Sequence, residues 1–342
     1  MASTIDDVAC LAGVSIKTVS RVVNREPNVR AVTREKVEAA IRELNYEPNP
    51  SARGLASRRS HLIGLLYDNL MAESTYVVNV QRGVLARCRN HGYELLIHPV
   101  GFHERGLRGL AEDITTHCRQ TRIDGAILTP PLSDLAPVLE TFDRLNKPFI
   151  RLCPSDIEHP SPCVHTNDRR AAARMTHYLQ ELGHRRIAFI SGHPEHQAVA
   201  QREDGFRDAM AAAGLDISPG SVLLGDSTYE SALEATRELL ALEPRPTAIF
   251  AATDDMAAGV LRVAHELGID VPGKLSVAGF DDSMIATRTW PALTTLRQPV
   301  IALAEVATDL LLGQMRGGTA PVHEIALDTE LVVRESTGPA PR

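Results

Sequence analysis

The chain has 342 residues, of which 44% are hydrophobic and 23% are charged, and its formal net charge is −7. This composition is typical of soluble globular proteins, and the length favours two or three domains. No apolar run approaches the length of about 18 residues that a membrane span needs, and the first residues lack the basic and apolar regions of a secretory signal. We therefore expect a cytoplasmic protein with no membrane partner.

The charge is distributed unevenly along the chain. Residues 1–60 carry ten Lys or Arg and seven Asp or Glu, whereas residues 61–342 carry 26 and 36. A small basic region joined to a larger acidic one is typical of a DNA-binding domain fused to a domain with a different partner.

The first part of the chain has the pattern of three short helices. Thr4 can cap the first helix with Asp7 as the capping carboxylate, and Gly13 can adopt the left-handed conformation that ends it. Ser15 caps a second helix after so tight a turn that the pair forms a helix-turn-helix, and Thr33 caps a third. Apolar residues recur at helical spacing along the three segments: Ile5, Val8, Ala9, Ala12, Ile16, Val19, Val23, Val37, Ala40, Ile41 and Leu44.

The exposed face of the second helix carries side chains that suit DNA. Lys and Arg donate to guanine acceptors in the major groove, and short hydroxyl side chains bind phosphate oxygens. Composition alone would equally suit the solvent-facing side of a small structural bundle. The residues on this face are Lys17, Thr18, Ser20, Arg21 and Asn24.

Two strings in this region, IDDVACLAGVSIKTVSRVVN and VTREKVEAAIRELNYEPNPSARGLA, closely resemble the DNA-binding head of the lactose-repressor (LacI/GalR) family of bacterial transcriptional regulators. The resemblance implies that the second helix enters the major groove of operator DNA. It places Lys17, Arg21 and Ile16 at base-reading positions, although Ile16 cannot hydrogen-bond to a base edge. It assigns phosphate contacts to Ser15, Thr18, Ser20, Asn24 and Thr33.

Residues 49–57 read as a very short helix, with Asn49 as its cap and Pro50 in its first turn. So short a helix is unstable alone, and Gly54 costs about 1 kcal/mol relative to Ala, so we expect it to fold on binding DNA. The resemblance implies a hinge helix that pairs with a second protomer in the minor groove, where Leu55 separates base steps. Its candidate DNA contacts are Asn49, Ala52 and Leu55.

Beyond about residue 61, short apolar runs alternate with helical segments. This alternation predicts parallel sheets covered by helices on both faces, and the number of runs favours two similar lobes over one sheet. The helices include Asp168–Leu182, Ala198–Ala213 and Met256–Leu267. The strand-like runs are 62–67, 93–98, 125–129, 148–152, 186–191, 221–224, 248–252 and 275–280.

The strings LGHRRIAFISG, QREDGF, ATDDMAAGV, VPGKLSVAGFDD and PALTTLRQP extend the resemblance over nearly the whole chain. It implies an all-α helix-turn-helix head followed by an α/β, two-lobed, periplasmic-binding-protein-like core. The head would span 1–48, the hinge helix and linker 49–60, and the effector-binding and dimerisation domain 61–335. Lobe one would hold about 61–160 and 298–318, and lobe two about 161–297 and 319–335.

Doubly wound sheets bind ligands at the carboxyl ends of their strands, and polar residues follow several of the predicted strands. A carboxylate beside a guanidinium can grip two neighbouring hydroxyls, which suits a sugar. The resemblance places effector contacts at Arg202, Thr253, Asp281 and Gln298 and a stacking ring at Tyr76, and the loop after the first strand adds Asp68 and Asn69.

Other polar residues near the strand ends are open to simpler interpretations. Asp254, Asp255 and Asp282 suit helix caps or surface ion pairs. Ser227 stands where the family often has an aromatic residue, so Tyr229 could supply that ring.

Chemistry of other kinds has little support in the sequence. Paired aspartates alone do not indicate a glycosidase, and the family is not enzymatic. The five cysteines form no C-x-x-C pair, which favours free thiols, and the H-x-x-H of His193 and His196 lies in a Gly-Pro loop without a third ligand. We therefore expect no metal and no other cofactor.

The sequence thus predicts a sequence-specific DNA-binding regulator, and we favour a repressor released by a carbohydrate or sugar-derived inducer. A repressor that needs a corepressor and an activator with a non-sugar effector stay open, and a sugar-binding transport protein fits the body but not the head. A pseudo-palindromic operator requires two heads, and the chain lacks the C-terminal leucine heptads of the family's tetramers, so we expect a homodimer.

Overall fold

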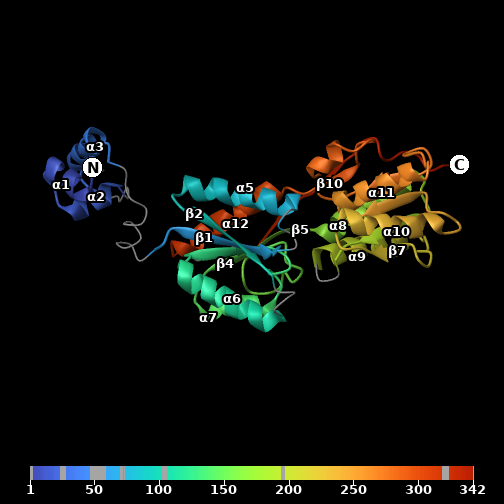
Figure 1. Ribbon diagram of the computed structural model, residues 1–342, viewed down its shortest axis with the longest axis horizontal. Coiled ribbons are helices and arrows are strands. Elements are labelled where there is room, and N and C mark those ends of the chain that lie inside the picture. Colours follow the sequence, from blue (N-terminus) through green and yellow to red (C-terminus); the bar gives the residue numbers. More distant parts are fainter. Residues whose placement is uncertain are drawn as a thin grey trace. The chain divides into compact units, whose positions relative to one another are not determined.

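The computed structural model describes residues 3–23, 28–46, 59–69, 72, 74–101, 106–193, 197–317 and 323–341. The chain forms two compact units, Met1–His61 and Leu62–Arg342, which we call the head and the body and describe separately (Figure 1). The predicted hinge helix, with its contacts Asn49, Ala52 and Leu55, and the predicted phosphate contact Asn24 lie outside the described residues.

The head packs three helices around Val8, Val19 and Val37, which are fully buried. As predicted, Thr4 and Asp7 form a capping box at the start of the first helix, because each side chain accepts a hydrogen bond from the other residue's backbone N–H. Gly13 ends that helix at φ 65°, and Ser15 Oγ accepts from the Thr18 N–H at 3.2 Å. The helices are α1 (Ile5–Ala12), α2 (Ile16–Val23) and α3 (Ala31–Glu43).

The third helix begins three residues earlier than predicted. Its N-cap is Arg30, which makes no side-chain capping bond, and Thr33 lies within the first turn, where its N–H donates to the Arg30 carbonyl at 3.0 Å. The prediction that Thr33 caps this helix is wrong. A favoured capping residue does not become a cap when the residues before it can themselves take helical dihedral angles.

The first lobe of the body is a six-stranded parallel sheet in the order β11-β5-β4-β3-β1-β2. Its helices α5 (Thr75–Asn90) and α12 (Val300–Met315) lie on one face, and α6 (Gly106–Thr121) and α7 (Ala136–Arg144) lie on the other (Figure 1). The strands are β1 (Leu62–Asp68), β2 (Glu94–Val100), β3 (Gly125–Leu128), β4 (Phe149–Leu152), β5 (Cys163–Thr166) and β11 (Glu324–Leu327). Because both faces are covered, β3 and β4 are buried throughout. β3 is a continuous apolar run, whereas β4 contains the buried Arg151.

The second lobe is a four-stranded parallel sheet in the order β7-β6-β8-β9. Phe189 packs against Phe206 and Phe250 at its centre, with ring centroids 5.2 Å apart in each pair. Its strands are β6 (Ile187–Ser191), β7 (Val222–Leu224), β8 (Ala248–Ala251) and β9 (Ser276–Ala278). Its helices are α8 (Asp168–Glu181), α9 (Gln197–Ala212), α10 (Tyr229–Ala241), α11 (Asp254–Glu266) and the 3-10 turn η2 (Met284–Thr287).

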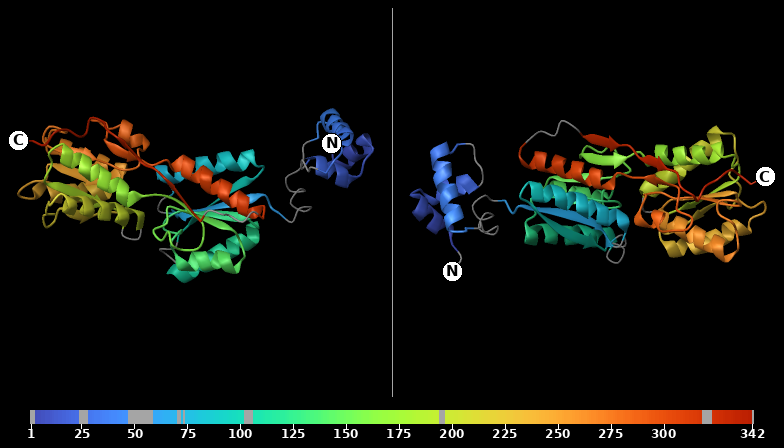
Figure 2. Two further views of the ribbon diagram at one scale, coloured as in Figure 1. Left: turned by 180° about the vertical axis from the view of Figure 1, so that it is seen from behind. Right: turned by 90° about the horizontal axis from the view of Figure 1, so that it is seen from above.

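All eight predicted strand runs contain a strand, but the predicted division between the lobes needs a correction. The sequence places 161–297 and 319–335 in the second lobe. In the structure, β5 pairs with β4, and β11 pairs with β5, so both strands belong to the first sheet (Figure 2). β5 has only four residues and includes a histidine, and β11 alternates between exposed and half-buried residues at the sheet edge, so neither shows an apolar run.

The chain therefore passes between the lobes three times: after β5, between β10 (Thr295–Arg297) and α12, and between β11 and β12 (Glu330–Val332). β10 and β12 form a separate antiparallel pair. Among the residues described above, no helix is long and apolar enough to cross a membrane.

The close contact of α8 with α9 depends on Gly205. A Cβ atom at this position would overlap the backbone carbonyl of Arg169 and lie 3.0 Å from the Ala173 nitrogen. We predict that Gly205→Ala lowers the free energy of unfolding by about 1–3 kcal/mol, because backbone atoms cannot yield as side chains do. Thermal unfolding of the purified protein measures the change.

Gly313, in α12, is the matched control, because a Cβ there has no neighbour within 4 Å. Gly313→Ala should leave the free energy of unfolding unchanged or raise it by up to about 1 kcal/mol, through helix propensity alone. Equal effects of the two substitutions would contradict the close-packing argument.

Candidate functional site

A cavity of about 380 Å³ lies in the body at the carboxyl ends of strands from both sheets. This is where parallel α/β sheets usually bind ligands, because loops and helix starts converge there. The residues that line it are Ser74, Thr75, Tyr76, Val77, Pro130, Cys153, Asp168, Ala198, Val199, Arg202, Ser227, Thr228, Tyr229, Glu230, Thr253, Asp255, Asp281, Ser283 and Gln298.

The guanidinium of Arg202 is the centre of the polar groups in this cavity. Its Nε donates to Asp168 Oδ2 at 2.9 Å, and its Nη1 donates to the Ala252 carbonyl at 2.6 Å and lies 3.6 Å from Asp281 Oδ1. Its Cζ stands 3.7 Å from the centroid of the Phe280 ring. The side chains of Arg202 and Asp168 are only 7% and 5% exposed, so this is a buried ion pair whose position is fixed on several sides.

Asp281 completes the polar group next to Arg202. Its Oδ1 accepts from Gln298 Nε2 at 2.6 Å, and the Gln298 carbonyl in turn lies 3.4 Å from the hydroxyl of Thr166. Thr166 also donates to Asp168 at 2.6 Å, which closes the network. Burial raises the pKa of Asp281 to about 6, although the Arg202 charge opposes this rise.

Two buried hydroxyls on the cavity wall have no satisfied hydrogen bond among the described residues: Tyr76 Oη and Ser283 Oγ. The Tyr76 hydroxyl lies beside the Cys153 thiol, and burial, followed by this neighbour, raises its pKa well above 10. Ser283 Oγ likewise lies near the Asp254 carboxylate. Buried polar atoms rarely remain unpaired in native proteins. A ligand in the cavity can offer each hydroxyl a better-aligned partner.

On the head, α2 presents the predicted base-reading side chains to solvent. Lys17 and Arg21 are exposed, and Ile16 is 47% exposed despite being apolar. Among the predicted phosphate contacts, Ser15 is exposed, and Thr18, Ser20 and Thr33 are half-buried. An exposed isoleucine between polar neighbours suits contact with a partner surface better than contact with water.

Comparison with known proteins assigns the two units. Residues 4–49 match the family described as bacterial regulatory proteins, lacI family, and residues 176–337 match the periplasmic binding protein-like domain. The chain is 33% identical to the ribose operon repressor of Escherichia coli (strain K12) over 336 residues, which are 98% of this chain and 99% of that protein. The chain belongs to the LacI family of bacterial regulatory proteins.

Other members of the family are similar over their full length. The regulator CelR of Thermobifida fusca is 34% identical over 340 residues, which cover 97% of this chain and 98% of CelR. The solved lac repressor dimer, bound to operator and the anti-inducer ONPF, matches with a TM-score of 0.83 and 29% identity over 99% of this chain and 100% of that chain. The CelR–cellobiose complex matches with a TM-score of 0.74 and 31% identity over 98% and 99%.

These likenesses confirm the predicted family and the predicted architecture of a helix-turn-helix head on a periplasmic-binding-protein-like core. The LacI-family chain is a DNA-binding transcriptional regulator.

Five of the seven predicted effector contacts line the cavity of this LacI-family regulator: Tyr76, Arg202, Thr253, Asp281 and Gln298. Asp68 is buried at the end of β1 and Asn69 is exposed beyond it, and neither lines the cavity. Their role as effector contacts stays a prediction.

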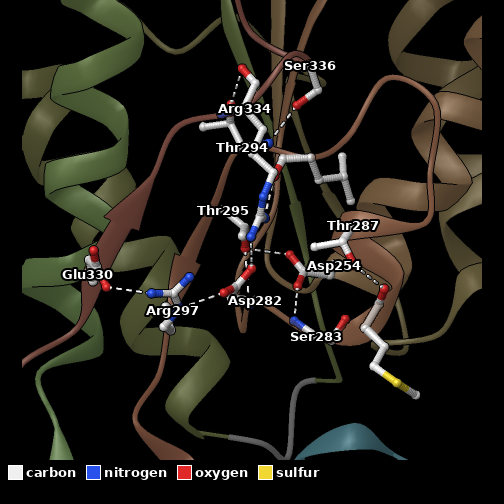
Figure 3. A network of polar contacts seen from close by, with 12 residues as sticks. Asp254, Asp282, Ser283, Thr287, Thr294, Thr295, Arg297, Glu330, Arg334 and Ser336 are labelled. Atoms are coloured by element: carbon white, nitrogen blue, oxygen red, sulfur yellow. Dashed lines mark hydrogen bonds and ion pairs between the residues drawn. The ribbon is translucent and has the colours of Figure 1, made fainter.

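Asp282 forms ion pairs, whereas Asp254 is neither a helix cap nor a surface ion pair, because Thr253 caps α11 and the Asp254 side chain is fully buried (Figure 3). Asp254 accepts from the Ser283 N–H at 2.7 Å and from the Thr295 hydroxyl at 2.5 Å, and burial raises its pKa to about 8. Asp282 pairs with Arg297 at 2.6 Å and with Arg334 at 2.5 Å. Asp255, by contrast, lines the cavity, as do Ser227 and Tyr229.

Sequence reasoning missed Asp168, Thr166 and Ser283 as parts of the site. Asp168 begins α8 directly after β5, the strand without an apolar run, so the loop between them was not recognised as a strand end. The sequence feature that could have located Asp168 is the preceding residue, Asn167, which is a favoured N-cap. Its side chain accepts a hydrogen bond from the Arg170 N–H at 2.9 Å.

The buried pair of Arg202 and Asp168 should contribute strongly to stability. We predict that Asp168→Asn, which keeps the shape but removes the charge, lowers the free energy of unfolding by about 3 kcal/mol, because a buried charge loses its closest partner. The measurement is denaturant unfolding of the purified protein.

Asp208→Asn is the control. It removes the partner of Arg169 in a pair whose side chains are about half exposed, and solvent screens such pairs. The unfolding midpoint of this variant should match that of the parent. A midpoint for Asp168→Asn as high as that of the control would refute the importance of burial.

Proposed function

We propose that this LacI-family regulator is a repressor that binds a pseudo-palindromic operator as a homodimer and is released by a carbohydrate or sugar-derived inducer in the cavity. The observation that carries the proposal is the pairing of Arg202 with Asp281 on the cavity wall. The names of its relatives support it, since the ribose operon repressor and the CelR–cellobiose complex both point to sugars.

The geometry of this pair suits two neighbouring hydroxyls. Among the described residues, Asp281 Oδ2 accepts no hydrogen bond and Arg202 Nη2 donates none, because the contacts of the two side chains use the other atoms. The pair therefore keeps one free acceptor and one free donor, and a sugar diol offers one of each. Tyr76 and Tyr229 add rings for the apolar faces of a sugar.

The same network suits a coupling between effector and DNA. Thr166 ends a strand of the first lobe, Gln298 stands where the chain returns from the second lobe, and Asp281 follows β9 in the second lobe. A ligand held by both lobes favours one of their relative orientations. It shifts the equilibrium between two forms by its difference in affinity for them, typically about 1–3 kcal/mol.

The first test of this function concerns base reading by α2. Arg21→Ala should cost about 1–3 kcal/mol of operator affinity and relax the preference at one or two base pairs, because Arg donates to guanine acceptors. Thr18→Ala, the control for a phosphate contact, should weaken binding to all sequences alike. Binding to a library of operator variants measures both effects, and an unchanged preference for Arg21→Ala would refute the assignment.

The second test concerns release. Asp281→Ala should bind operator like the parent but stay bound at sugar concentrations that free the parent, because it loses the acceptor for the ligand. Asp216→Ala, which removes an exposed carboxylate outside the cavity, should respond like the parent. Calorimetry with and without operator measures the coupling.

Equal sugar affinity in the presence and absence of operator would contradict induction. Tighter sugar binding on operator would make the ligand a corepressor, which is the alternative to this proposal.

A further inference from the structure

Five helices begin at the cavity wall: α5, α8, α9, α10 and α11. A helix N-terminus carries a partial positive charge and unpaired N–H groups, and it is a common binding site for phosphate and carboxylate. A cavity ringed by five such ends would ordinarily favour an anionic ligand.

Four of these N-termini are occupied by side chains of this chain, and the N-cap position of α9 lies outside the described residues. In each of the four, the side chain of the N-cap residue accepts a hydrogen bond from an N–H of the first turn, at 2.9–3.2 Å. The capping residues are Ser74, Asn167, Thr228 and Thr253.

Three of the five helices also carry a carboxylate at the cavity in their first turn: Asp168, Glu230 and Asp255. α5 and α9 carry none there. Acidic side chains at these positions cancel the positive end of the helix. The pKa of Asp255 is raised by burial and then by the charge of Glu230, so these two carboxylates repel each other.

The balance of full charges in the cavity is also negative. Among the described residues that line it, Asp168, Glu230, Asp255 and Asp281 are acidic, and Arg202 is the only Lys or Arg. Arg202 is already paired with Asp168 and lies beside Asp281. Neither Asp255 nor Glu230 has an ion-pair partner among the described residues.

Two buried hydroxyls on the wall suit an uncharged ligand. Ser283 is only 7% exposed, and neither its Oγ nor the buried Tyr76 hydroxyl forms a well-aligned hydrogen bond among the described residues, although they lie near Asp254 and Cys153. A hydroxyl can both donate and accept, so it pairs with the hydroxyls of a polyol without any change of charge.

We propose that the cavity selects an effector without an anionic group: an unmodified, uncharged sugar binds, and phosphorylated or carboxylated sugars are rejected by Asp255 and Glu230. A phosphate carries a charge of about −1.5 to −2 at neutral pH, and the like charges of half-buried Asp255 and exposed Glu230 oppose its binding. This inference rests on the proposed function, because it names the chemical class of the ligand for the same cavity.

The test is calorimetric titration of the full-length protein with matched pairs of sugars. The pairs are methyl β-D-ribofuranoside and its 5-phosphate, D-glucose and either glucose 6-phosphate or glucuronate, and cellobiose and cellobiouronate. The neutral sugar that binds should bind at least tenfold more tightly than its anionic counterpart. Each pair shares its ring and most hydroxyls, so the ratio reports the added charge.

A variant that removes the charges of two cavity carboxylates tests whether they cause the preference for neutral sugars. In the double variant Asp255→Asn/Glu230→Gln, the ratio of neutral to anionic affinity should fall at least threefold. The double variant Asp216→Asn/Glu234→Gln removes two exposed carboxylates outside the cavity and is matched in net charge, so it should keep the ratio of the parent. Equal ratios in the two double variants would show that these side chains do not select against anions, and would overturn the proposal.

The two proposals fail in different ways. An anionic sugar that binds more tightly than its neutral counterpart overturns this inference but leaves a sugar-released repressor in place. If no sugar of the panel binds or releases operator, the sugar effector itself fails, and this inference falls with it.

Discussion

The buried guanidinium of Arg202 is the constraint on which the arrangement of the cavity depends. A charge removed from water must be paired, and here Asp168, Asp281 and the Ala252 carbonyl surround it. Arg202 lies one turn before Gly205, which lets α9 approach the backbone of α8. The missing side chain at Gly205 thus brings the guanidinium to the start of α8, where Asp168 stands.

The same constraint connects the lobes. The partners of Arg202 come from the start of α8 and from the loop after β9, and Thr166 and Gln298 extend the network to the segments where the chain passes from one lobe to the other. Polar groups that a ligand can contact are therefore held on the connections themselves. A ligand at this place acts where the lobes are joined, so a small difference in its contacts can change their relative orientation.

Local signals in the sequence predicted much of the fold. The capping box of Thr4 and Asp7 and the glycine after α1 are determined by neighbouring residues, so the first helix could be predicted closely. Thr33 shows the limit, because capping preference is weak against residues that can simply continue the helix. β5 was missed because a strand of four residues gains its burial from β4 and β11, which are distant in sequence.

The residues of the candidate site were likewise predictable only in part. Arg202, Asp281 and Gln298 could be placed through family resemblance, whereas Asp168 becomes visible only when β5 brings the start of α8 to the cavity. The sign of the charge in the cavity could not be predicted either, since it depends on which carboxylates at the helix starts and strand ends face inward.

The passage of β11 back into the first sheet has a consequence for synthesis. The head is complete by about residue 46, but the strand at one edge of the first sheet is contributed by Glu324–Leu327, close to the end of the chain. At a translation rate of about 5–20 residues per second, roughly 15–55 seconds separate the two. A nascent chain on the ribosome therefore carries a finished DNA-binding head well before the first sheet of the body is complete. A chain that ended prematurely would keep the head but lack the complete sheet that an effector response needs.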